Sequence, residues 1–276
     1  MKEFKGKAIY NPSGKAGEYS YWACNFYNGC SNDCTYCYCK RGVMSSNWCN
    51  PPKLKSKFKD ENHALEIFEK ELVQNLHELK EHGLFFSFTT DPMLMETREL
   101  TYRAIGVAIK NKVPVKILTK VADFTSALLQ SIYPDLIETW KPYVAFGFTL
   151  TGHDELEPNA STNAERIEAM KKLHDAGFKT FASIEPIIDF KSSYKIFQMT
   201  ANSKICDLYK IGLESGKKYN KEELDYFIRD VIWFTNPRNG HNIKIYFKDS
   251  LLQVAGINRS DLPNSCVGRD YNIFKN

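Results

Sequence analysis

The sequence predicts an α/β protein in which the strands of a parallel sheet alternate with helices. Three observations favour this class. Short apolar runs alternate with segments of helical periodicity from Ala64 onward, glycines stand at expected helix ends, and polar residues follow the apolar runs. Six or seven such units are too few for a closed eight-stranded barrel. We therefore expect a partial (β/α)6 barrel with an open side for substrate.

The expected elements follow from hydrophobic periodicity and helix-end signals. Strands are expected at 21–25, 84–89, 115–119, 144–150, 180–184, 208–211 and 243–247. Helices are expected at 64–83, 96–112, 123–132, 161–176 (capped by Ser161), 194–201 and 220–234 (capped by Asn220). We divide the chain into an N-terminal extension at 1–19, the barrel at 20–248 and a C-terminal extension at 249–276, which is mostly polar.

Length and composition limit the class of protein. The 276 residues, 43% of them hydrophobic, suffice for one large domain with a sizeable core. No apolar run reaches about 18 residues and the first residues lack the apolar core of a signal peptide, so we expect a cytoplasmic protein with no membrane span. Six of the eight cysteines fall between Cys24 and Cys49, which favours metal or redox chemistry over a disulfide scaffold.

A compact cysteine motif is the strongest chemical signal in the sequence. Cys30, Cys34 and Cys37 form C-x3-C-x2-C, with Tyr36 before the last cysteine. Three thiolates on one short loop can hold three irons of a [4Fe-4S] cluster and leave the fourth iron open, as catalytic metal sites keep one position free. The alternatives are an electron-transfer cluster or a structural zinc site completed by a nearby cysteine: Cys24, Cys39 or Cys49. Zinc sites usually consist of two separated C-x2-4-C pairs.

With this motif the chain resembles radical S-adenosylmethionine (SAM) enzymes, and in particular their spore photoproduct lyase-like branch. That likeness covers about residues 20–200 and rests on these segments: Cys30–Cys39, Thr89–Pro92, Leu118–Lys120, Thr149, Glu157–Pro158 and Arg166–Ala169. The remainder resembles a phage-associated subgroup of unassigned function through Ser183–Pro186, Gly212–Gly216 and Tyr246–Lys248. The resemblance implies a [4Fe-4S] cluster, SAM cleaved reductively, abstraction of a substrate hydrogen, and a reductant such as flavodoxin or ferredoxin.

Polar residues at the ends of the expected strands complement the polar groups of SAM, because the carboxyl ends of parallel strands meet at one rim. The strand-end residues expected to bind the cofactor are Thr90, Asp91, Lys120, Thr149, Thr151, Ser183 and Glu185. The resemblance implies the following roles: Cys30, Cys34 and Cys37 as cluster ligands, Tyr36 beside the adenine, Thr90 and Asp91 toward the ammonium, Lys120 and Arg166 toward the carboxylate, and Thr149 toward the ribose or carboxylate.

One position departs from spore photoproduct lyase. Phe88 stands where that enzyme places a hydrogen-donating cysteine, whereas the two tyrosines that take part in its hydrogen return are present as Tyr36 and Tyr38. Tyr38, Cys39 or Cys49 could supply a hydrogen atom instead. Tyr36, Tyr38 and Cys39 are therefore our candidate catalytic residues.

The charge distribution gives a second functional signal. Residues 1–59 carry a net charge of +7 and the remaining chain −3, and the segment 40–59 holds six basic residues and no acid. A basic segment with interleaved aromatics can follow phosphates and stack bases, although it can also be an ordinary solvated loop. We therefore expect modification or repair of a nucleic acid or nucleotide. The alternatives are a radical enzyme acting on a peptide, a partner protein or a small metabolite, and a non-catalytic Fe-S or zinc protein.

Overall fold

A computed structural model of the chain describes residues 3–130, 134–235 and 243–275. Its main sheet has eight strands in the order β1-β2-β5-β6-β7-β8-β9-β10. Strand β1 is antiparallel to β2, and every other neighbouring pair is parallel. The predicted parallel α/β class is confirmed. The described residues contain seven parallel strands, which correspond to the seven strands expected from the sequence, and β10 is the strand expected at 243–247.

The strands have these bounds: β1 Ile9–Tyr10, β2 Ala23–Cys24, β3 Tyr27–Asn28, β4 Lys53–Leu54, β5 Leu84–Phe86, β6 Val115–Thr119, β7 Val144–Thr149, β8 Lys179–Ile187, β9 Leu208–Leu213 and β10 Lys244–Phe247. The α-helices are α1 Gly14–Gly17, α2 Glu61–Gln74, α3 Leu76–His82, α4 Arg98–Lys110, α5 Phe124–Leu129, α6 Pro134–Trp140, α7 Asn163–Asp175, α8 Phe190–Asn202, α9 Lys221–Phe234 and α10 Asp249–Ala255. Short 3-10 helices cover Tyr38–Lys40, Gly42–Asn47, Asp154–Leu156 and Arg259–Asp261.

Several predicted boundaries differ from the observed ones. The helix expected at 64–83 is split at Asn75 into α2 and α3. The N-cap of α7 is Thr162, which forms a reciprocal capping box with Glu165, and not Ser161. Ser161 instead accepts a hydrogen bond from the main-chain N–H of Ala122 at 2.9 Å. The reciprocal hydrogen bonds between Thr162 and Glu165, three residues later, therefore place the start of this helix after Thr162.

Differences also occur at strand ends. Strand β5 ends at Phe86, three residues before the predicted end, whereas β8 continues through the predicted terminus to Ile187 with an irregular register after Ile184. Helix α6 was not predicted, and the last two residues of the helix expected at 123–132 lie outside the described residues. Helix α10 lies in the segment predicted to be a polar extension. The proposed domain boundaries at 19/20 and 248/249 stay predictions.

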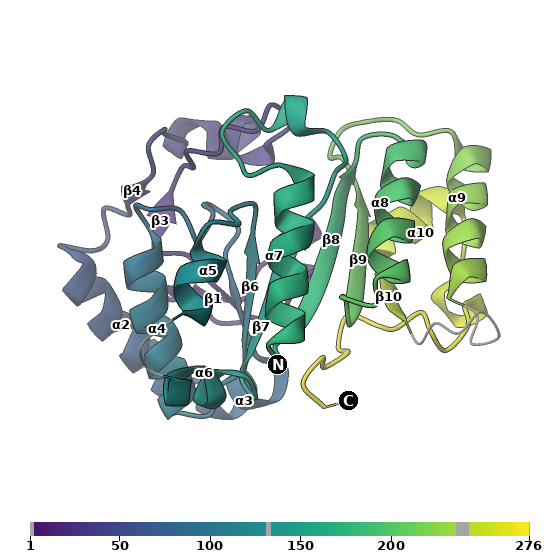
Figure 1. Ribbon diagram of the computed structural model, residues 1–276. Coiled ribbons are helices and arrows are strands. Elements are labelled where there is room, and N and C mark those ends of the chain that lie inside the picture. The colour runs from purple at the N-terminus through teal and green to yellow at the C-terminus, as the bar shows by residue number, and fades with distance from the viewer. Residues whose placement is uncertain (1–2, 131–133, 236–242, 276) are drawn as a thin grey trace.

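The helices that follow the parallel strands cover the outer face of the sheet (Figure 1). The segment between β3 and β4 carries the cysteine motif and lies across the end of the sheet where the parallel strands terminate (Figure 1). Because β3 and β4 pair with each other, the two ends of this segment are held together. The cysteines are thereby placed over the carboxyl ends of the strands, where ligands bind in open α/β sheets.

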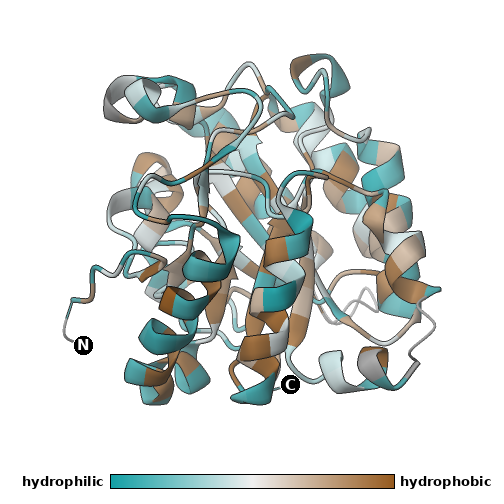
Figure 2. Ribbon diagram, turned by 90° about the vertical axis from the view of Figure 1, so that its left-hand side faces the viewer, coloured by the Kyte–Doolittle hydropathy of each residue, from teal (hydrophilic) through white to brown (hydrophobic). Residues whose placement is uncertain are grey.

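Helix α9 illustrates why these segments fold as surface helices. Asn220 caps its first turn by accepting hydrogen bonds from Glu222 N at 2.8 Å and Glu223 N at 3.1 Å. Leu224, Phe227, Ile228, Val231 and Phe234 form its buried face. Figure 2 shows the corresponding alternation of hydrophilic and hydrophobic bands along the helices. None of the helices in the described part of the chain combines the length and apolarity that a membrane crossing needs.

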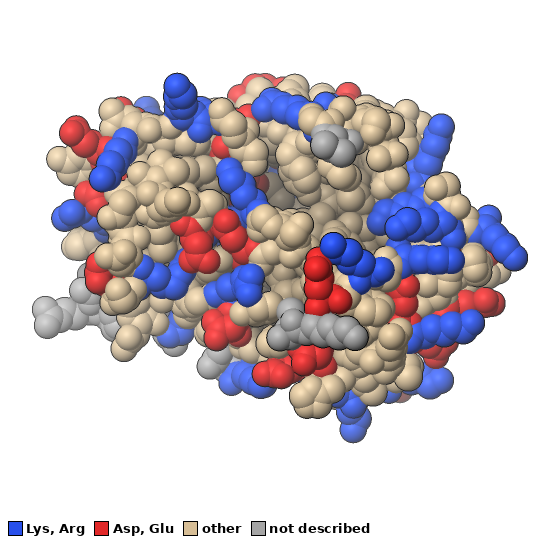
Figure 3. Space-filling view, turned by 180° about the vertical axis from the view of Figure 1, so that it is seen from behind, with Lys and Arg blue, Asp and Glu red and all other residues tan. Residues whose placement is uncertain are grey.

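The inner face of the sheet lines a separate small core. Successive strand residues point to opposite faces, so Phe85 and Leu118 belong to an inner cluster with Tyr19 and Tyr246, whereas their neighbours face the helices. Ile273 completes this inner cluster from the C-terminal segment. The face of the molecule seen from behind is hollowed (Figure 3). The chain thus fills one end of the partial barrel with side chains and leaves the other end open.

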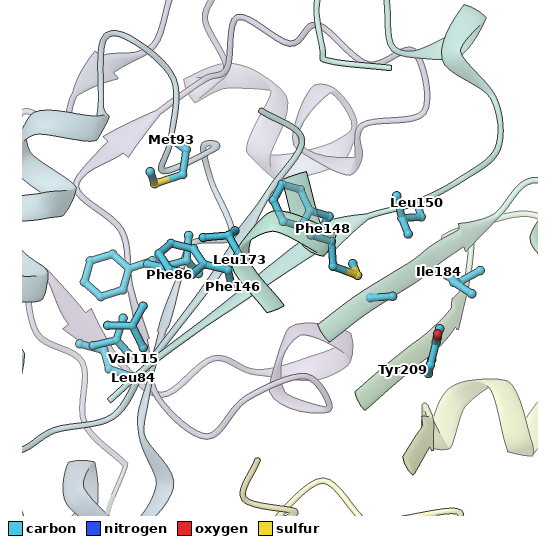
Figure 4. Close-up of a cluster of buried hydrophobic side chains, with 14 of the residues drawn as sticks. Leu84, Phe86, Met93, Val115, Phe146, Phe148, Leu150, Leu173, Ile184 and Tyr209 are labelled. Atoms are coloured by element: carbon cyan, nitrogen blue, oxygen red, sulfur yellow. The ribbon is translucent and has the colours of Figure 1, made fainter. Parts of the chain in front are cut away.

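The main core lies between the outer face of the sheet and the helices (Figure 4). Phe86, Val115 and Phe146 come from neighbouring strands, and Leu173 comes from α7. All four are at most 1% exposed. Burying a side chain of this kind contributes about 1.5–3 kcal/mol, so this layer stabilises the packing of the helices against the sheet.

Substituting Gly147→Ala should destabilise the protein by about 1–3 kcal/mol or more, because an added Cβ would lie 2.2 Å from the Phe181 ring inside the sheet. The matched control is Gly106→Ala on α4, where nothing lies within 4 Å of the added carbon. That change should stabilise the helix by about 0.5–1 kcal/mol. Denaturant unfolding followed by circular dichroism measures both changes, and equal midpoints for the two variants would contradict this packing.

Candidate functional site

One cavity of about 420 Å3 contains the predicted site. Cys30, Cys34 and Cys37 all line it, together with Thr90 and Lys120 from strand ends. A volume of this size lies in the range of cavities that bind small molecules and cofactors. Apart from Thr151 and Arg166, every residue that the sequence predicted for the site lines this cavity.

The carboxylate of Asp91 fastens the cysteine loop to the sheet. Its Oδ2 accepts hydrogen bonds from Asn32 Nδ2 at 2.8 Å and from Lys120 N at 2.7 Å. Its Oδ1 accepts from Thr119 Oγ1 at 2.6 Å and from Met93 N at 3.0 Å. Four such bonds use the acceptor capacity of a carboxylate and offset the cost of burying its charge. Asp91 therefore joins the cysteine loop to the ends of β5 and β6.

A second buried carboxylate ties the same loop to α7. Glu157 accepts hydrogen bonds from the Tyr36 hydroxyl and from Arg166 Nη2, and its side chain is fully buried. Arg166 also donates to the carbonyl oxygens of Ser161 at 2.8 Å and Thr149 at 2.5 Å. Burial and the negative charge of Glu157 both raise the pKa of Tyr36, so the phenol stays protonated. Arg166 thus supports the loop from behind instead of lining the cavity.

Lys120 presents its ammonium group to the cavity. Its Nζ lies 5.6 Å from the centre of the Tyr36 ring. Burial alone would lower the pKa of Lys120, but the charges of Cys34 and Glu157 outweigh it, so the pKa is raised and the group stays cationic. No carboxylate in the described part of the chain lies within 4.0 Å of this ammonium, although it is held near the cysteines. Lys120 can therefore pair with an anionic group of a bound molecule.

The candidate hydrogen donors lie together at one edge of the cavity. The Tyr38 hydroxyl donates to the carbonyl oxygen of Phe88, and Cys39 Sγ lies 3.5 Å from the same oxygen. A hydrogen bond with Cys39 lowers the pKa of the Cys37 thiol to about 6, whereas burial raises that of Cys30 to about 12. Cys24 and Cys49 lie outside the cavity lining. Of the extra cysteines considered from the sequence, Cys39 alone joins the triplet there.

Two predicted residues lie behind the cavity wall. Thr151 is fully buried, and its main-chain N–H donates to Asn163 Oδ1 at 3.0 Å. Its hydroxyl accepts from His153 N at 3.2 Å. Arg166 donates hydrogen bonds to Glu157 and to the carbonyl oxygens of Ser161 and Thr149. The cofactor-binding roles expected for Thr151 and Arg166 stay predictions, and the geometry gives both residues internal partners.

Several buried polar atoms at the cavity have no partner in the described chain. They include Thr90 Oγ1, Asn32 Oδ1 and Trp48 Nε1, and these three residues line the cavity. An unsatisfied buried polar group costs about 1–3 kcal/mol, so such atoms call for a bound partner. A ligand rich in hydroxyl, amino and carboxylate groups would satisfy them.

A comparison with family models decides the class of the protein. The model of the Radical SAM superfamily matches residues 24–190, more than half of the chain. The chain belongs to the radical SAM superfamily. The predicted membership is confirmed, and with it an enzyme of the radical SAM class. A search of curated proteins found no match.

Solved structures share the fold of this radical SAM protein at low identity. A variant of spore photoproduct lyase matches with a TM-score of 0.59 and 15% identity over 83% of this chain and 76% of that chain. Another, "with bound AdoMet and dinucleoside spore photoproduct", matches with a TM-score of 0.54 and 16% identity over 77% of this chain. Streptococcus suis SuiB "bound to precursor peptide SuiA" gives 0.53 and 13% over 86%. The predicted likeness to the spore photoproduct lyase-like branch is confirmed at the level of the fold, and the phage-associated subgroup stays a prediction.

The radical SAM protein spans 61% of the spore photoproduct lyase chain with bound AdoMet and 52% of the SuiB chain with bound peptide. Membership of the superfamily implies a [4Fe-4S] cluster and SAM. Within the described residues, no three His, Cys, Asp or Glu side chains converge closely enough to hold a single metal ion. A cluster needs less convergence, because each thiolate binds a different iron. Three cysteines on one wall, the Lys120 ammonium and the unpartnered Thr90 hydroxyl together fit a cluster with SAM beside it.

Three contributors to the site were missed or left without a role by sequence reasoning. Glu157 stands in a segment that the resemblance highlighted, yet no role was given to it. Tyr19 lines the cavity from the loop before β2, and no local pattern marks it. Lys248 follows the last strand, where a basic residue was noted but not assigned. Its position at the end of a parallel strand was the signal that could have placed it at the site.

The basic segment 40–59 has two parts. Lys40 and Lys55 serve the fold: Lys40 Nζ contacts Asp33 Oδ1 at 2.5 Å, and Lys55 Nζ donates to the carbonyl of Asn25 at 2.8 Å. The side chains of Lys53, Lys57 and Lys59 are exposed. The segment reaches the cavity through Lys40 and Trp48, whose ring centre lies 4.8 Å from Lys40 Nζ.

Replacing Arg166→Met should destabilise the protein by about 3–5 kcal/mol, because Glu157 would keep a buried charge without its partner. The double variant Glu157→Gln/Arg166→Met removes both charges and should recover more than half of that loss. Denaturant unfolding of the two variants beside the unmodified protein measures the difference. A double variant less stable than the single one would contradict the pairing described here.

Proposed function

We propose that Cys30, Cys34 and Cys37 hold three irons of a [4Fe-4S] cluster and leave the fourth iron to SAM. The observation that carries this proposal is the convergence of all three thiols on one cavity that also contains a cationic lysine and unpartnered polar atoms. When bound and reduced, the cluster and SAM together supply a 5′-deoxyadenosyl radical that abstracts a hydrogen from the substrate.

The chain's own residues would position SAM and shield it. Lys120 would pair with the carboxylate of SAM, and Thr90 would hydrogen-bond its amino acid moiety. Thr149 and Ser183 line the cavity from neighbouring strands and would reach the ribose. Phe88 and Leu118 would exclude water from the reacting carbon, since they form apolar parts of the wall. Tyr38 and Cys39 remain the proposed sources of a returning hydrogen atom.

We further propose that the substrate is a nucleic acid or nucleotide. The exposed lysines at 53, 57 and 59 belong to a segment that reaches the cavity at Lys40 and Trp48, so a backbone held by these lysines could enter the site. A structural relative holds a dinucleoside, and another holds a peptide. A peptide substrate is therefore the alternative that the binding experiment below must exclude.

Substituting Cys34→Ala should reduce the iron content of anaerobically reconstituted protein to less than about a quarter of the normal value, because three thiolates anchor the cluster. Iron and sulfide analysis with the visible absorption spectrum measures this change. Cys206→Ala is the matched control, since Cys206 lies before β9 and its Sγ contacts the carbonyl of Leu208 at 3.2 Å. Unchanged iron in the Cys34 variant would refute the ligand assignment.

Neutralising Lys53, Lys57 and Lys59 together, each to Gln, should weaken binding of single-stranded DNA or RNA uniformly across sequences. The slope of log K against log salt should fall by about two to three, because each phosphate contact releases bound counterions. Fluorescence anisotropy with labelled oligonucleotides at several salt concentrations measures the slope.

The control neutralises three exposed lysines on and after α8, Lys191, Lys195 and Lys204. This variant has the same net charge but should keep the slope of the unmodified protein. If the unmodified protein fails to bind any oligonucleotide at low salt, the nucleic-acid proposal is wrong and the peptide alternative becomes the better one.

A further inference from the structure

A partly buried ion pair lies in the cavity wall formed by the last strands of the sheet. Lys248 Nζ is 2.7 Å from Glu185 Oε1, and the Lys248 side chain is 3% exposed. Glu185 belongs to β8, and Lys248 follows β10 directly. Both residues line the cavity. Lys248 lies outside the residues 24–190 that match the family model, so it is not part of the region shared with that model.

The backbone around the pair leaves room for it. Gly212 lies on β9, between the two strands that carry the pair. An added Cβ at this position would lie 2.7 Å from both Glu185 Cδ and Lys248 Cδ. A larger residue would therefore push the two side chains out of place. The close approach of the pair to this strand depends on glycine.

Aromatic rings form the neighbouring wall of the same cavity. Tyr19, Phe85 and Phe88 all line it. The ring centres of Tyr19 and Phe85 are 5.0 Å apart, and those of Phe85 and Phe88 are 4.6 Å apart. Tyr19 also connects the two walls, since Lys248 Nζ lies 5.9 Å from its ring centre. A flat ring lying against these aromatics would place its edge near the ion pair.

The pair has hydrogen-bonding capacity beyond its own contact. An ammonium has three donors and a carboxylate has several acceptor positions, whereas one bond between the two groups is found in the described chain. The pair is neutral as a whole. An anionic group would meet the Glu185 carboxylate, and a cationic group would meet Lys248. A neutral group with an acceptor next to a donor fits both partners.

We propose that the Glu185–Lys248 pair recognises the hydrogen-bonding edge of a neutral planar heterocycle in the substrate, with the ring lying against Tyr19, Phe85 and Phe88. Lys248 donates to a ring carbonyl or imine nitrogen, and Glu185 accepts from the adjacent N–H. This inference rests on the proposed function and specifies the substrate group that binds here, which is the base. The phosphates would be bound by the basic segment 40–59. The sequence analysis expected Glu185 to bind the cofactor. The proposal assigns Glu185 to the substrate instead.

The test measures binding of four free nucleosides, uridine, cytidine, adenosine and guanosine, to anaerobically reconstituted protein with SAM by equilibrium dialysis. The unmodified protein should bind at least one nucleoside at millimolar concentration or below. Lys248→Met and Glu185→Gln should each weaken that binding about ten- to a hundredfold, because each removes a charge-assisted hydrogen bond. The dissociation constant of SAM, measured in the same samples, should change by less than about twofold.

Two further variants keep the test interpretable. Lys244→Met removes a lysine from β10, the strand that directly precedes Lys248; Lys244 lies outside the cavity lining, so this change should leave nucleoside binding unchanged. The double variant Glu185→Gln/Lys248→Met leaves no unpaired charge and should fold even if Lys248→Met does not. It should bind nucleosides as weakly as the single variants.

The outcomes separate this inference from the proposed function. Release of 5′-deoxyadenosine by a protein that binds no nucleoside would overturn the base site and leave the radical chemistry standing. Pair-dependent nucleoside binding without any SAM cleavage would uphold the site and count against the proposed function. Parallel loss of SAM and nucleoside affinity would assign the pair to the cofactor. Binding of ribose 5-phosphate that depends on Lys248 would make the pair an anion site, and either result would overturn the proposal.

Discussion

The buried carboxylate of Asp91 is the interaction on which the rest of the site depends. A charge taken out of water is tolerated only when it is fully hydrogen-bonded, and this one accepts from Asn32, Thr119 and two main-chain N–H groups. Those donors come from the cysteine loop and from two strand ends. The cysteine loop therefore cannot move away from the sheet without exposing or orphaning a charge. This requirement holds the cysteine loop, and with it the three thiols, against the strand ends.

A second buried carboxylate, Glu157, restrains the loop in the same way, since it accepts hydrogen bonds from Tyr36 and Arg166. Two buried acids thus restrain one loop, and Lys120 lies near both charges, with no carboxylate of the described residues within 4.0 Å of its ammonium. A third acid, Glu185, is partly buried, and its pairing with the buried Lys248 leaves no net charge. The cavity accordingly has a cationic part beside the cysteines and a neutral polar part at the last strands. This difference in charge separates where an anionic amino acid group and a neutral ring can bind.

Much of this arrangement could be predicted because it follows from strand geometry. Parallel strands end at one rim, so residues such as Thr90 and Lys120 were expected to meet the cysteine loop, and they do. Side-chain partners could not be predicted in the same way. Arg166 has the residue type for binding a carboxylate of SAM, yet nothing in the sequence shows that its guanidinium is taken by Glu157 and carbonyl groups. Lys248 finds its partner 63 residues away, and only the folded sheet brings the two together.

The central claim is that three cysteines leave one iron of a cluster free for SAM. The most direct measurement is the electron paramagnetic resonance spectrum of anaerobically reconstituted, dithionite-reduced protein before and after addition of SAM. The account predicts close to four irons per chain and a change in the cluster signal when SAM is added, because SAM binds the open iron. A cluster signal that SAM leaves unaltered, or a protein that binds zinc in place of iron, would contradict it.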